Sequence, residues 1–271
     1  MMYSAKQKTI CCKSGAKLSP IMDIMLTKNI SPSPLVLTIA GFDPSTGAGI
    51  LADIKAFEHC KVYGQAVCTA LTIQNEEFFE KPNWLPWERI KSQLQILSRV
   101  RNFNYVKIGL VENSQTLEKI FKWLRRKFPN AFIIWDPILK ASSGFEFHKQ
   151  NALTWQKLFS YANLIMPNLP EAEFLGISKG SAKTAVLVKG GHSCGLQKSE
   201  DLLFLPHCPA PIIFASKRII GAEKHGSGCT FSALVLANFA KCNDLDKAIR
   251  ISKKSMQSFF ENGSDKLGTL K

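Results

Sequence analysis

Residues 35–58, LVLTIAGFDPSTGAGILADIKAFE, decide the fold class of this chain. The apolar run 35–40 predicts a buried strand, residues 41–49 predict a glycine-rich turn, and residues 50–58 have the pattern of a helix. A strand, a glycine-rich turn and a helix in this order are how α/β proteins place a ligand at the carboxyl end of a strand. The turn matches neither G-x-G-x-x-G nor G-x-x-x-x-G-K-[ST], so it indicates an α/β fold without identifying the ligand.

Strands and helices alternate along the rest of the chain. Apolar runs at 65–71, 105–108, 131–135, 164–166 and 185–188 predict strands, and apolar residues at helical spacing predict helices over 90–100, 117–124 and 152–161. The segment 81–87 contains prolines and tryptophans and is interpreted as a loop. Most of these strands end in polar or glycine residues, so we expect the ligand-binding groups to gather at one edge of a mostly parallel sheet.

The second informative stretch is HGSGCT at 225–230, which precedes the apolar run FSALVLANFA at 231–240. The glycines at 226 and 228 allow a tight turn, and the apolar run predicts a helix, so free N–H groups of Gly226, Ser227 and Gly228 would form an anion hole. A thiol at Cys229 would lie at the positive end of the helix dipole, where we expect a lowered pKa and an available thiolate base. A glycine-rich helix cap with a buried structural cysteine is the alternative.

Polar residues at three other strand ends are candidates for phosphate chemistry. Asn168 and Glu171 could present an amide and a carboxylate to a hydrated Mg²⁺, or could form an ordinary helix N-cap with Glu at the third position. Asp136 is either a metal-linked or charge-organising carboxylate, or a turn residue before proline. Lys189, beside two glycines, suits phosphate charge, and a solvated loop lysine is the alternative.

Four more side chains have weaker signals. The amide of Gln74 can donate and accept together, which suits an aminopyrimidine edge or any heteroaromatic ring, although a surface loop Gln has the same pattern. Asp53 on the first helix is interpreted as a surface or packing residue unless its face lines the pocket. His192 and His225 neighbour glycine turns and are interpreted as structural, because no metal-ligand spacing surrounds them.

Composition restricts the class of protein. The chain has 271 residues, 45% of them hydrophobic, and a net charge of +14 from 35 basic and 21 acidic residues. The basic residues are scattered, so we expect an anionic substrate such as a nucleotide phosphate and no specific nucleic-acid partner. Eight cysteines without a C-x-x-C pair indicate reduced thiols and a cytoplasmic protein. No apolar run reaches the length of a membrane span.

The first thirty residues differ from the rest of the chain. They contain five lysines against one acidic residue and show no periodic apolar face. We interpret residues 1–30 as a disordered tail, or as a sequence that precedes the true start, and residues 31–271 as a single domain.

Four blocks in the same order carry a resemblance to a known family: LTIAGFDPSTGAGILADIKAF, the strands YVKIG and IIWDPIL, the stretch MPNLPEAEFLG, and VLVKGGH with HGSGCT. Over the chain from about residue 35 to the helix after Thr230, these blocks resemble the ribokinase-like superfamily. Within it they resemble the hydroxymethylpyrimidine/phosphomethylpyrimidine kinases of thiamine biosynthesis. The resemblance implies a three-layer α/β/α sandwich with a mostly parallel sheet, and relatives are often homodimers.

The resemblance also implies the activity and the roles of individual residues. ATP with Mg²⁺ would phosphorylate 4-amino-5-hydroxymethyl-2-methylpyrimidine and then its monophosphate. Cys229 matches the catalytic position, Lys189 a lysine near the transferred phosphate, and Asn168 and Glu171 the pair that organises Mg²⁺, with Asp136 on the same ATP side. The implied substrate-binding positions are Gln74, Gly41, Ala48, Leu110 and Ile138, with Asp53 as a further candidate.

Three departures from the family pattern bear on the site. Thr46 stands where the family usually has glycine, the span between Glu171 and Lys189 is short, and residues 76–87 diverge where relatives have substrate-covering flaps. A connection between parallel strands needs about a dozen residues, so we expect the sheet topology to survive the short span. Two other functions stay open: a pyridoxal or pyridoxine kinase, and a non-catalytic pyrimidine or nucleotide sensor on the same fold.

Overall fold

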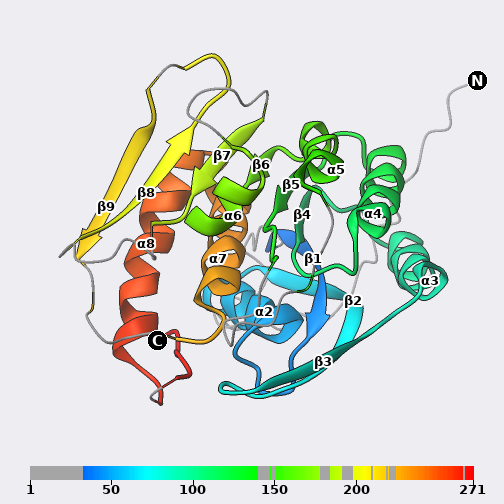
Figure 1. Ribbon diagram of the computed structural model, residues 1–271, viewed down its shortest axis with the longest axis horizontal. Coiled ribbons are helices and arrows are strands. Elements are labelled where there is room, and N and C mark those ends of the chain that lie inside the picture. The colour runs from blue at the N-terminus through cyan, green and yellow to red at the C-terminus, as the bar shows by residue number, and fades with distance from the viewer. Residues whose placement is uncertain are drawn as a thin grey trace, which may run out of the picture. The chain divides into compact units, whose positions relative to one another are not determined.

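The sheet at the centre of the protein has nine strands in the order β3-β2-β1-β4-β5-β6-β7-β8-β9 (Figure 1). The computed structural model describes residues 33–139, 147, 151–177, 184–190, 198–208, 210–217, 219, 224–264 and 266–271, and every element below belongs to the unit Pro34–Lys271. Neighbouring strands from β2 through β1 and β4 to β7 are parallel, whereas β3, β8 and β9 are joined by antiparallel pairings. The strands are β1 (Leu35–Phe42), β2 (Tyr63–Gln74), β3 (Phe79–Trp84), β4 (Tyr105–Ile108), β5 (Phe132–Trp135), β6 (Leu164–Ile165), β7 (Ala185–Val188), β8 (Lys198–Phe204) and β9 (Ile212–Lys217).

Helices cover both faces of this sheet, so the predicted three-layer α/β/α arrangement is confirmed. The helices are α2 (Gly49–His59), α3 (Trp87–Ser98), α4 (Ser114–Lys127), α5 (Ala152–Gln156), α6 (Leu169–Phe174), α7 (Ser227–Cys242) and α8 (Leu245–Glu261), with a short 3₁₀ turn η1 (Phe159–Tyr161). One apolar layer joins the sheet to α3, α4 and α5, and a second joins it to α2, α7 and α8. Figure 1 shows α3 beside α4 and α7 beside α8.

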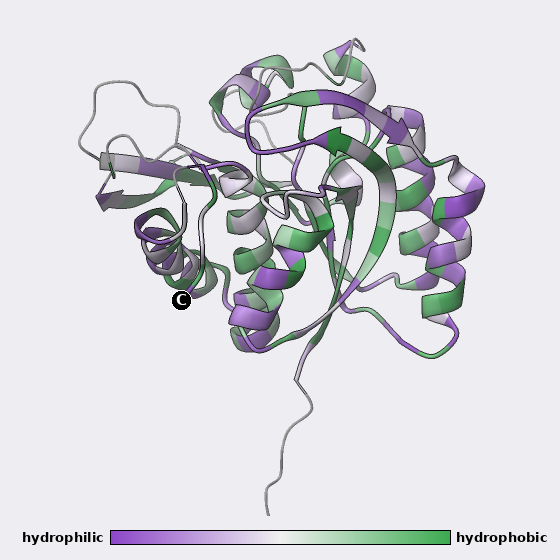
Figure 2. Cartoon of the chain, turned by 90° about the horizontal axis from the view of Figure 1, so that it is seen from below, coloured by the Kyte–Doolittle hydropathy of each residue, from purple (hydrophilic) through white to green (hydrophobic). Residues whose placement is uncertain are grey.

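Strand alternation explains the two layers. Leu37 and Ile39 on β1 point into the layer of α3 and α4, while their neighbour Val36 points to the opposite face, into the layer of α2 and α7. On β5, Ile133 likewise points into the layer of α3 and α4, and Ile134 into the layer of α2 and α7. Figure 2 accordingly shows apolar central strands between helices on which apolar and polar segments alternate.

Helix α4 illustrates how local sequence sets an element. Asn113 caps its first turn by accepting a hydrogen bond from Thr116 N at 2.8 Å, and its apolar residues at 117, 120, 121 and 124 form one buried face. Near the other end, Arg125 donates to the carbonyls of Ala131 at 2.7 Å and Tyr161 at 2.6 Å and to Asn163 Oδ1 at 2.8 Å. The guanidinium therefore ties α4 to the segments that lead into β5 and β6.

The structure corrects two interpretations made from the sequence. Residues 81–84, expected in a loop, belong to β3, which pairs antiparallel with β2; Pro82 is tolerated because β3 is the edge strand. The antiparallel strands β8 and β9 were not foreseen. The expected survival of the topology across the short span is confirmed, because β6 and β7 pair in parallel. Among the described residues, no helix has the length and apolar character needed to cross a membrane.

Candidate active site

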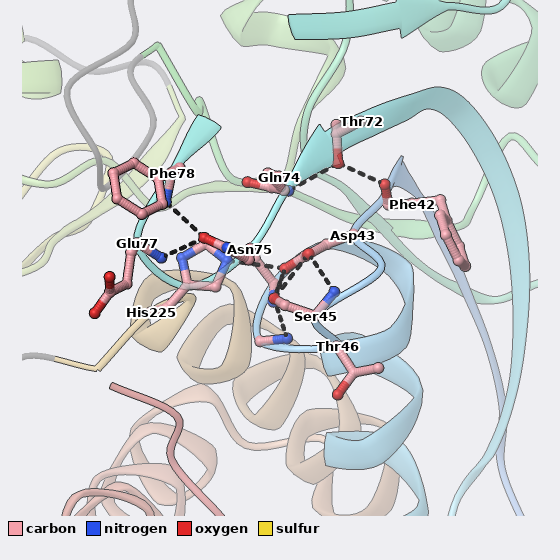
Figure 3. A network of polar contacts seen from close by, with 12 residues as sticks. Phe42, Asp43, Ser45, Thr46, Thr72, Gln74, Asn75, Glu77, Phe78 and His225 are labelled. Atoms are coloured by element: carbon pink, nitrogen blue, oxygen red, sulfur yellow. Dashed lines mark hydrogen bonds and ion pairs between the residues drawn. The ribbon is translucent and has the colours of Figure 1, made fainter. Parts of the chain in front are cut away.

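The turn after β1 is built around the carboxylate of Asp43, which is 1% exposed. Asp43 accepts hydrogen bonds from Ser45 N at 2.9 Å and Ala48 N at 2.8 Å, and His225 Nε2 lies 2.8 Å from its Oδ2 (Figure 3). Burial by itself would raise the pKa of Asp43, but these hydrogen bonds outweigh burial and hold that pKa below its usual range. His225 is therefore structural, as expected, and joins the β1–α2 turn to the segment before α7.

The start of α7 packs directly on that turn. Gly226 has φ of 69°, and a Cβ atom built on it would lie 1.9 Å from Gly47 O and 2.8 Å from Ala48 Cα. Only glycine fits such a left-handed position against backbone. Residues Ser227, Gly228 and Cys229 form the first turn of α7. Ser227 N donates to Lys224 O at 3.3 Å and so is not a free N–H of the predicted anion hole, whereas Gly228 and Cys229 have no carbonyl four residues earlier in the helix to bind. The start of α7 is thus held against the expected substrate loop.

A lysine from the end of β7 meets this helix start. Lys189 Nζ donates to Asp136 Oδ1 at 2.6 Å and lies 3.3 Å from where a Cβ of Gly228 would stand. Asp136, at the end of β5, accepts at its other oxygen from Ser232 Oγ at 2.8 Å. Burial would lower the pKa of Lys189, but Asp136 and Glu171 raise it and prevail, so the ammonium stays charged beside the helix start.

Asn168 and Glu171 form the capping box that the sequence left open as an alternative. Asn168 Oδ1 accepts from Glu171 N at 2.8 Å, and Glu171 Oε2 accepts from Asn168 N at 2.7 Å. Burial raises the pKa of Glu171 to about 7, against the lowering effect of Lys189. Lys189 N also donates to Pro167 O at 2.8 Å, which places the lysine beside this pair.

Magnesium fits this pair only through water molecules and phosphate oxygens. The single side-chain oxygen of Asn168 already accepts a backbone N–H, and the Glu171 carboxylate accepts from Asn168 N and from the backbone of Leu139. Within the described residues no three His, Cys, Asp or Glu side chains gather where they could hold a metal ion. Mg²⁺ commonly keeps several waters and binds one or two carboxylates together with substrate phosphates. The donor set of Asn168 and Glu171 is compatible with that kind of site.

The expectation of a lowered Cys229 pKa is wrong in this structure. The Cys229 side chain is 7% exposed, and burial raises its pKa to about 11, although Lys107 opposes that rise. The helix terminus and a backbone N–H from Gly49 do not overcome the loss of water around the sulfur. The residue is therefore a thiol at neutral pH.

The structure brings some of the residues of the expected pocket wall close to one another. A Cβ on Gly41 would lie 3.1 Å from Leu110 Cδ2, and a Cβ on Gly109 would lie 3.7 Å from Ile138 Cδ1. Ala48 lies between the Asp43 carboxylate and the start of α7. Gln74, at the end of β2, donates to Thr72 Oγ1 at 2.9 Å, and Thr72 in turn donates to Phe42 O at the end of β1 (Figure 3).

Asp53 does not lie on a helix surface or an open pocket wall. It is 0% exposed and accepts hydrogen bonds from Thr38 Oγ1 and Lys107 Nζ, both at 2.5 Å. A direct substrate contact by Asp53 is therefore contradicted, because both carboxylate oxygens are engaged inside the protein. Sequence reasoning missed Lys107, although a lysine between Val106 and Ile108 in a buried strand was an available signal. His192 lies outside the described residues.

Comparison with known proteins agrees with this geometry. Residues 43–269 match the family "Phosphomethylpyrimidine kinase". The chain belongs to this family. It is 34% identical over 252 residues to a hydroxymethylpyrimidine/phosphomethylpyrimidine kinase of Aquifex aeolicus, covering 86% of this chain and 96% of that protein.

Solved structures of two kinds of kinase are similar to this chain. The phosphomethylpyrimidine kinase of Clostridium difficile superposes with a TM-score of 0.68 and 28% identity, over 83% of this chain and 98% of that one. An ADP complex of the pyridoxal kinase of Bacillus subtilis superposes with a TM-score of 0.74 and 26% identity, over 88% and 97% of the two chains. This family member is accordingly a ribokinase-like kinase of the group that includes hydroxymethylpyrimidine and pyridoxal kinases.

Proposed function

We propose that the chain transfers the γ-phosphoryl group of ATP to the hydroxymethyl oxygen of 4-amino-5-hydroxymethyl-2-methylpyrimidine, and then a second phosphoryl group to the resulting monophosphate. The observation that carries this proposal is the meeting of a lysine whose side chain is 12% exposed, a glycine-rich helix start and a thiol at one sheet edge. Lys189, Gly228 and Cys229 supply these groups, and the β1–α2 turn packs against them. The family match and the nucleotide complex of a relative support the choice of ATP as donor.

Positioning and charge stabilisation account for most of phosphoryl-transfer catalysis. Lys189 and the N–H groups at the start of α7 would bind the transferred phosphoryl group, whose oxygens carry the developing charge. Asp136 holds the lysine in place through a contact of 2.6 Å. This contact holds the ammonium beside the helix start without a ligand, so we expect little reorganisation on binding.

Cys229 is the group proposed to take the proton of the hydroxymethyl oxygen. With a pKa near 11 it is protonated at neutral pH, so it must first release its proton to water before it can take the hydroxyl proton. A general base works best when its pKa lies near the operating pH, so the thiolate, a small fraction of Cys229 at neutral pH, would be the active form. When bound near Asn168 and Glu171, Mg²⁺ would neutralise part of the triphosphate charge.

Product analysis with purified protein tests the proposal. MgATP and the hydroxymethylpyrimidine should give first the monophosphate and then the diphosphate, resolved by anion-exchange chromatography. Cys229→Ala should lower kcat strongly, whereas the matched variant Cys60→Ala alters another buried thiol and should leave turnover close to wild type. If Cys229→Ala kept nearly full turnover, the assignment of the base would fail while the anion hole could stand.

Pyridoxal serves as the competing substrate, because solved relatives with this fold include pyridoxal kinases. Phosphorylation of pyridoxal without any pyrimidine diphosphate would reassign the chain to vitamin B6 phosphorylation. Absence of product from both substrates, with nucleotide binding retained, would instead support a sensor.

A further inference from the structure

An ion pair that is nearly closed to solvent joins strand β8 to helix α8. Lys253 Nζ donates to Asp201 Oδ2 at 2.5 Å, and the two side chains are 10% and 7% exposed. Asp201 lies on the same face of β8 as Leu203, which belongs to the apolar layer under α8. Such a pair usually contributes no more stability than well-packed apolar side chains of the same volume. Folding stability alone therefore does not account for it.

The other oxygen of the same carboxylate holds the backbone directly after the active-site lysine. Asp201 Oδ1 accepts a hydrogen bond from Gly190 N at 2.7 Å. Lys189 and Gly190 directly follow β7, which pairs antiparallel with β8. A Cβ built on Gly190 would lie 1.8 Å from Glu200 O, so the chain at this point lies against the backbone of β8. Asp201 thus fixes the chain exactly one residue beyond Lys189.

Lys189 is consequently held at three points. Its own N–H donates to Pro167 O at 2.8 Å, on the side of β6, and its ammonium donates to Asp136 Oδ1 at 2.6 Å. The N–H of the following residue, Gly190, is held by Asp201 on the side of β8. Because the peptide groups before and after its Cα are both bound, the Lys189 backbone has little freedom to turn. The direction in which its side chain leaves the backbone therefore depends on Asp201.

Helix α8 also binds α7, whose first turn lies beside the Lys189 ammonium. Asn238 Nδ2 on α7 donates to Ser252 Oγ on α8 at 3.0 Å, and both residues are buried. Ser252 directly precedes Lys253, so α8 is bonded to α7 at one residue and to Asp201 at the next. The two parts of the expected phosphate site, the lysine after β7 and the start of α7, are thus joined through α8.

We propose that Asp201 and Lys253 are positioning residues for phosphoryl transfer: their ion pair fixes the backbone at Lys189 and thereby places the Lys189 ammonium at the start of α7. Both act through Lys189, and neither is a catalytic residue. The inference rests on the proposed function, in which Lys189 binds the transferred phosphoryl group. A displacement of about 1 Å at a reacting centre can lower a rate about 100-fold, so the placement of this ammonium matters for turnover.

Replacement of the pair by apolar residues separates positioning from net charge. Asp201→Leu/Lys253→Met removes one charge of each sign and keeps a similar volume. We expect kcat to fall about 10- to 100-fold, and KM for the hydroxymethylpyrimidine to change less than about twofold, because the expected substrate-binding residues lie on other elements. Lys253→Arg keeps a cation for Asp201 and should retain most of kcat. The control Glu118→Gln/Lys122→Met removes an exposed ion pair of α4 and should match wild type.

A double-mutant cycle with Lys189 identifies the route of the effect. Lys189→Met should lower kcat, and should weaken binding of AMP-PCP with Mg²⁺, measured by isothermal titration calorimetry, by at least about tenfold. Adding Asp201→Leu/Lys253→Met to Lys189→Met should change either quantity less than about twofold, because the lysine that the pair positions is gone. Effects that multiply would show a purely structural pair and overturn the inference. Wild-type kcat and AMP-PCP affinity in Lys189→Met would also overturn it.

A second variant covers the case in which the apolar pair does not fold. Asp201→Asn/Lys253→Met keeps an oxygen that can accept from Gly190 N, and should lower kcat by a smaller factor. Wild-type kcat in a folded variant of the pair would overturn the inference. If the wild-type protein phosphorylates neither the hydroxymethylpyrimidine nor pyridoxal, the proposed function fails. The cycle on AMP-PCP affinity then still decides whether the pair acts through Lys189, because it needs no phosphate acceptor.

Discussion

Replacement of Gly226 by alanine should lower the stability of the protein, whereas replacement of Gly228 by alanine should keep or raise it. In Gly226→Ala the new residue must adopt a φ of 69°, which costs an alanine about 1–2 kcal/mol. Its Cβ would also lie 1.9 Å from Gly47 O, where ordinary contacts begin at 3.4 Å. The β1–α2 turn must therefore move back by roughly 1.5 Å, which strains the Asp43–His225 contact at 2.8 Å and costs about 1 kcal/mol more.

We therefore expect Gly226→Ala to lower the free energy of unfolding by about 2–3 kcal/mol, or Tm by roughly 4–12 °C for a domain of this size. The matched variant is Gly228→Ala, whose Cβ would meet only the Lys189 side-chain nitrogen, at 3.3 Å. Inside α7 an alanine gains up to about 1 kcal/mol over glycine. Gly228→Ala should keep or raise Tm while turnover falls, because the methyl group occupies the space beside the ammonium.

Differential scanning calorimetry gives the Tm of each variant, and the product assay gives its turnover number. A wild-type Tm for Gly226→Ala would refute the close packing of the two loops. Equal losses of stability in both variants would refute the distinction between a backbone contact at 1.9 Å and a side-chain contact at 3.3 Å.

Three other predictions concern single side chains. The folded pKa of Glu171 is raised from 4.5 to about 7, so the stability that its protonated form contributes is complete below pH 4.5 and is lost as pH rises through 7. In urea unfolding without metal, the free energy of unfolding of Glu171→Gln should therefore rise by about 2.5 kcal/mol relative to wild type between pH 5 and pH 8. The control Glu173→Gln, at an exposed residue of the same helix, should show no such rise. Thr46 has φ of 63°, which is unfavourable for a β-branched residue. Thr46→Gly should therefore raise Tm by up to about 3 °C in calorimetry, and a lower Tm would contradict backbone strain at residue 46. Arg125→Lys cannot reproduce the fork of contacts to two carbonyls and Asn163, and should cost about 2 kcal/mol in urea unfolding at unchanged kcat; a change in kcat would show that the clamp reaches the site.

Local patterns were sufficient for the elements that are buried and continuous. The run 35–40 and the helical pattern 50–58 correspond to β1 and α2, and 105–108 coincides with β4. Strand β3 was missed because Pro82 and the nearby tryptophans resemble a loop, and only its place at the edge of the sheet allows a proline there. Edge position is a property of the whole sheet, so the segment itself could not show it.

The site was predictable as a set of strand ends but not as a network of charges. Asp136, Asn168 and Lys189 come from three strand ends, and the parallel order of the strands brings them together. The raised Cys229 pKa was not predictable, because the helix-dipole argument omits the loss of water around the sulfur. Neither were contacts such as His225 with Asp43, which join residues 182 positions apart.

The Thr38–Asp53–Lys107 cluster also has a consequence for folding. Side chains alternate between faces along a strand, so a shift of β4 by one residue would turn Lys107 toward the apolar layer of α3 and α4 and leave Asp53 without its cation. An unpaired buried charge is costly enough to exclude that arrangement, whereas the apolar neighbours Val106 and Ile108 would tolerate it far better. The same ammonium would then select one strand register among competing compact states, and a chain with Lys107→Met and Asp53→Asn would fold with less discrimination between them.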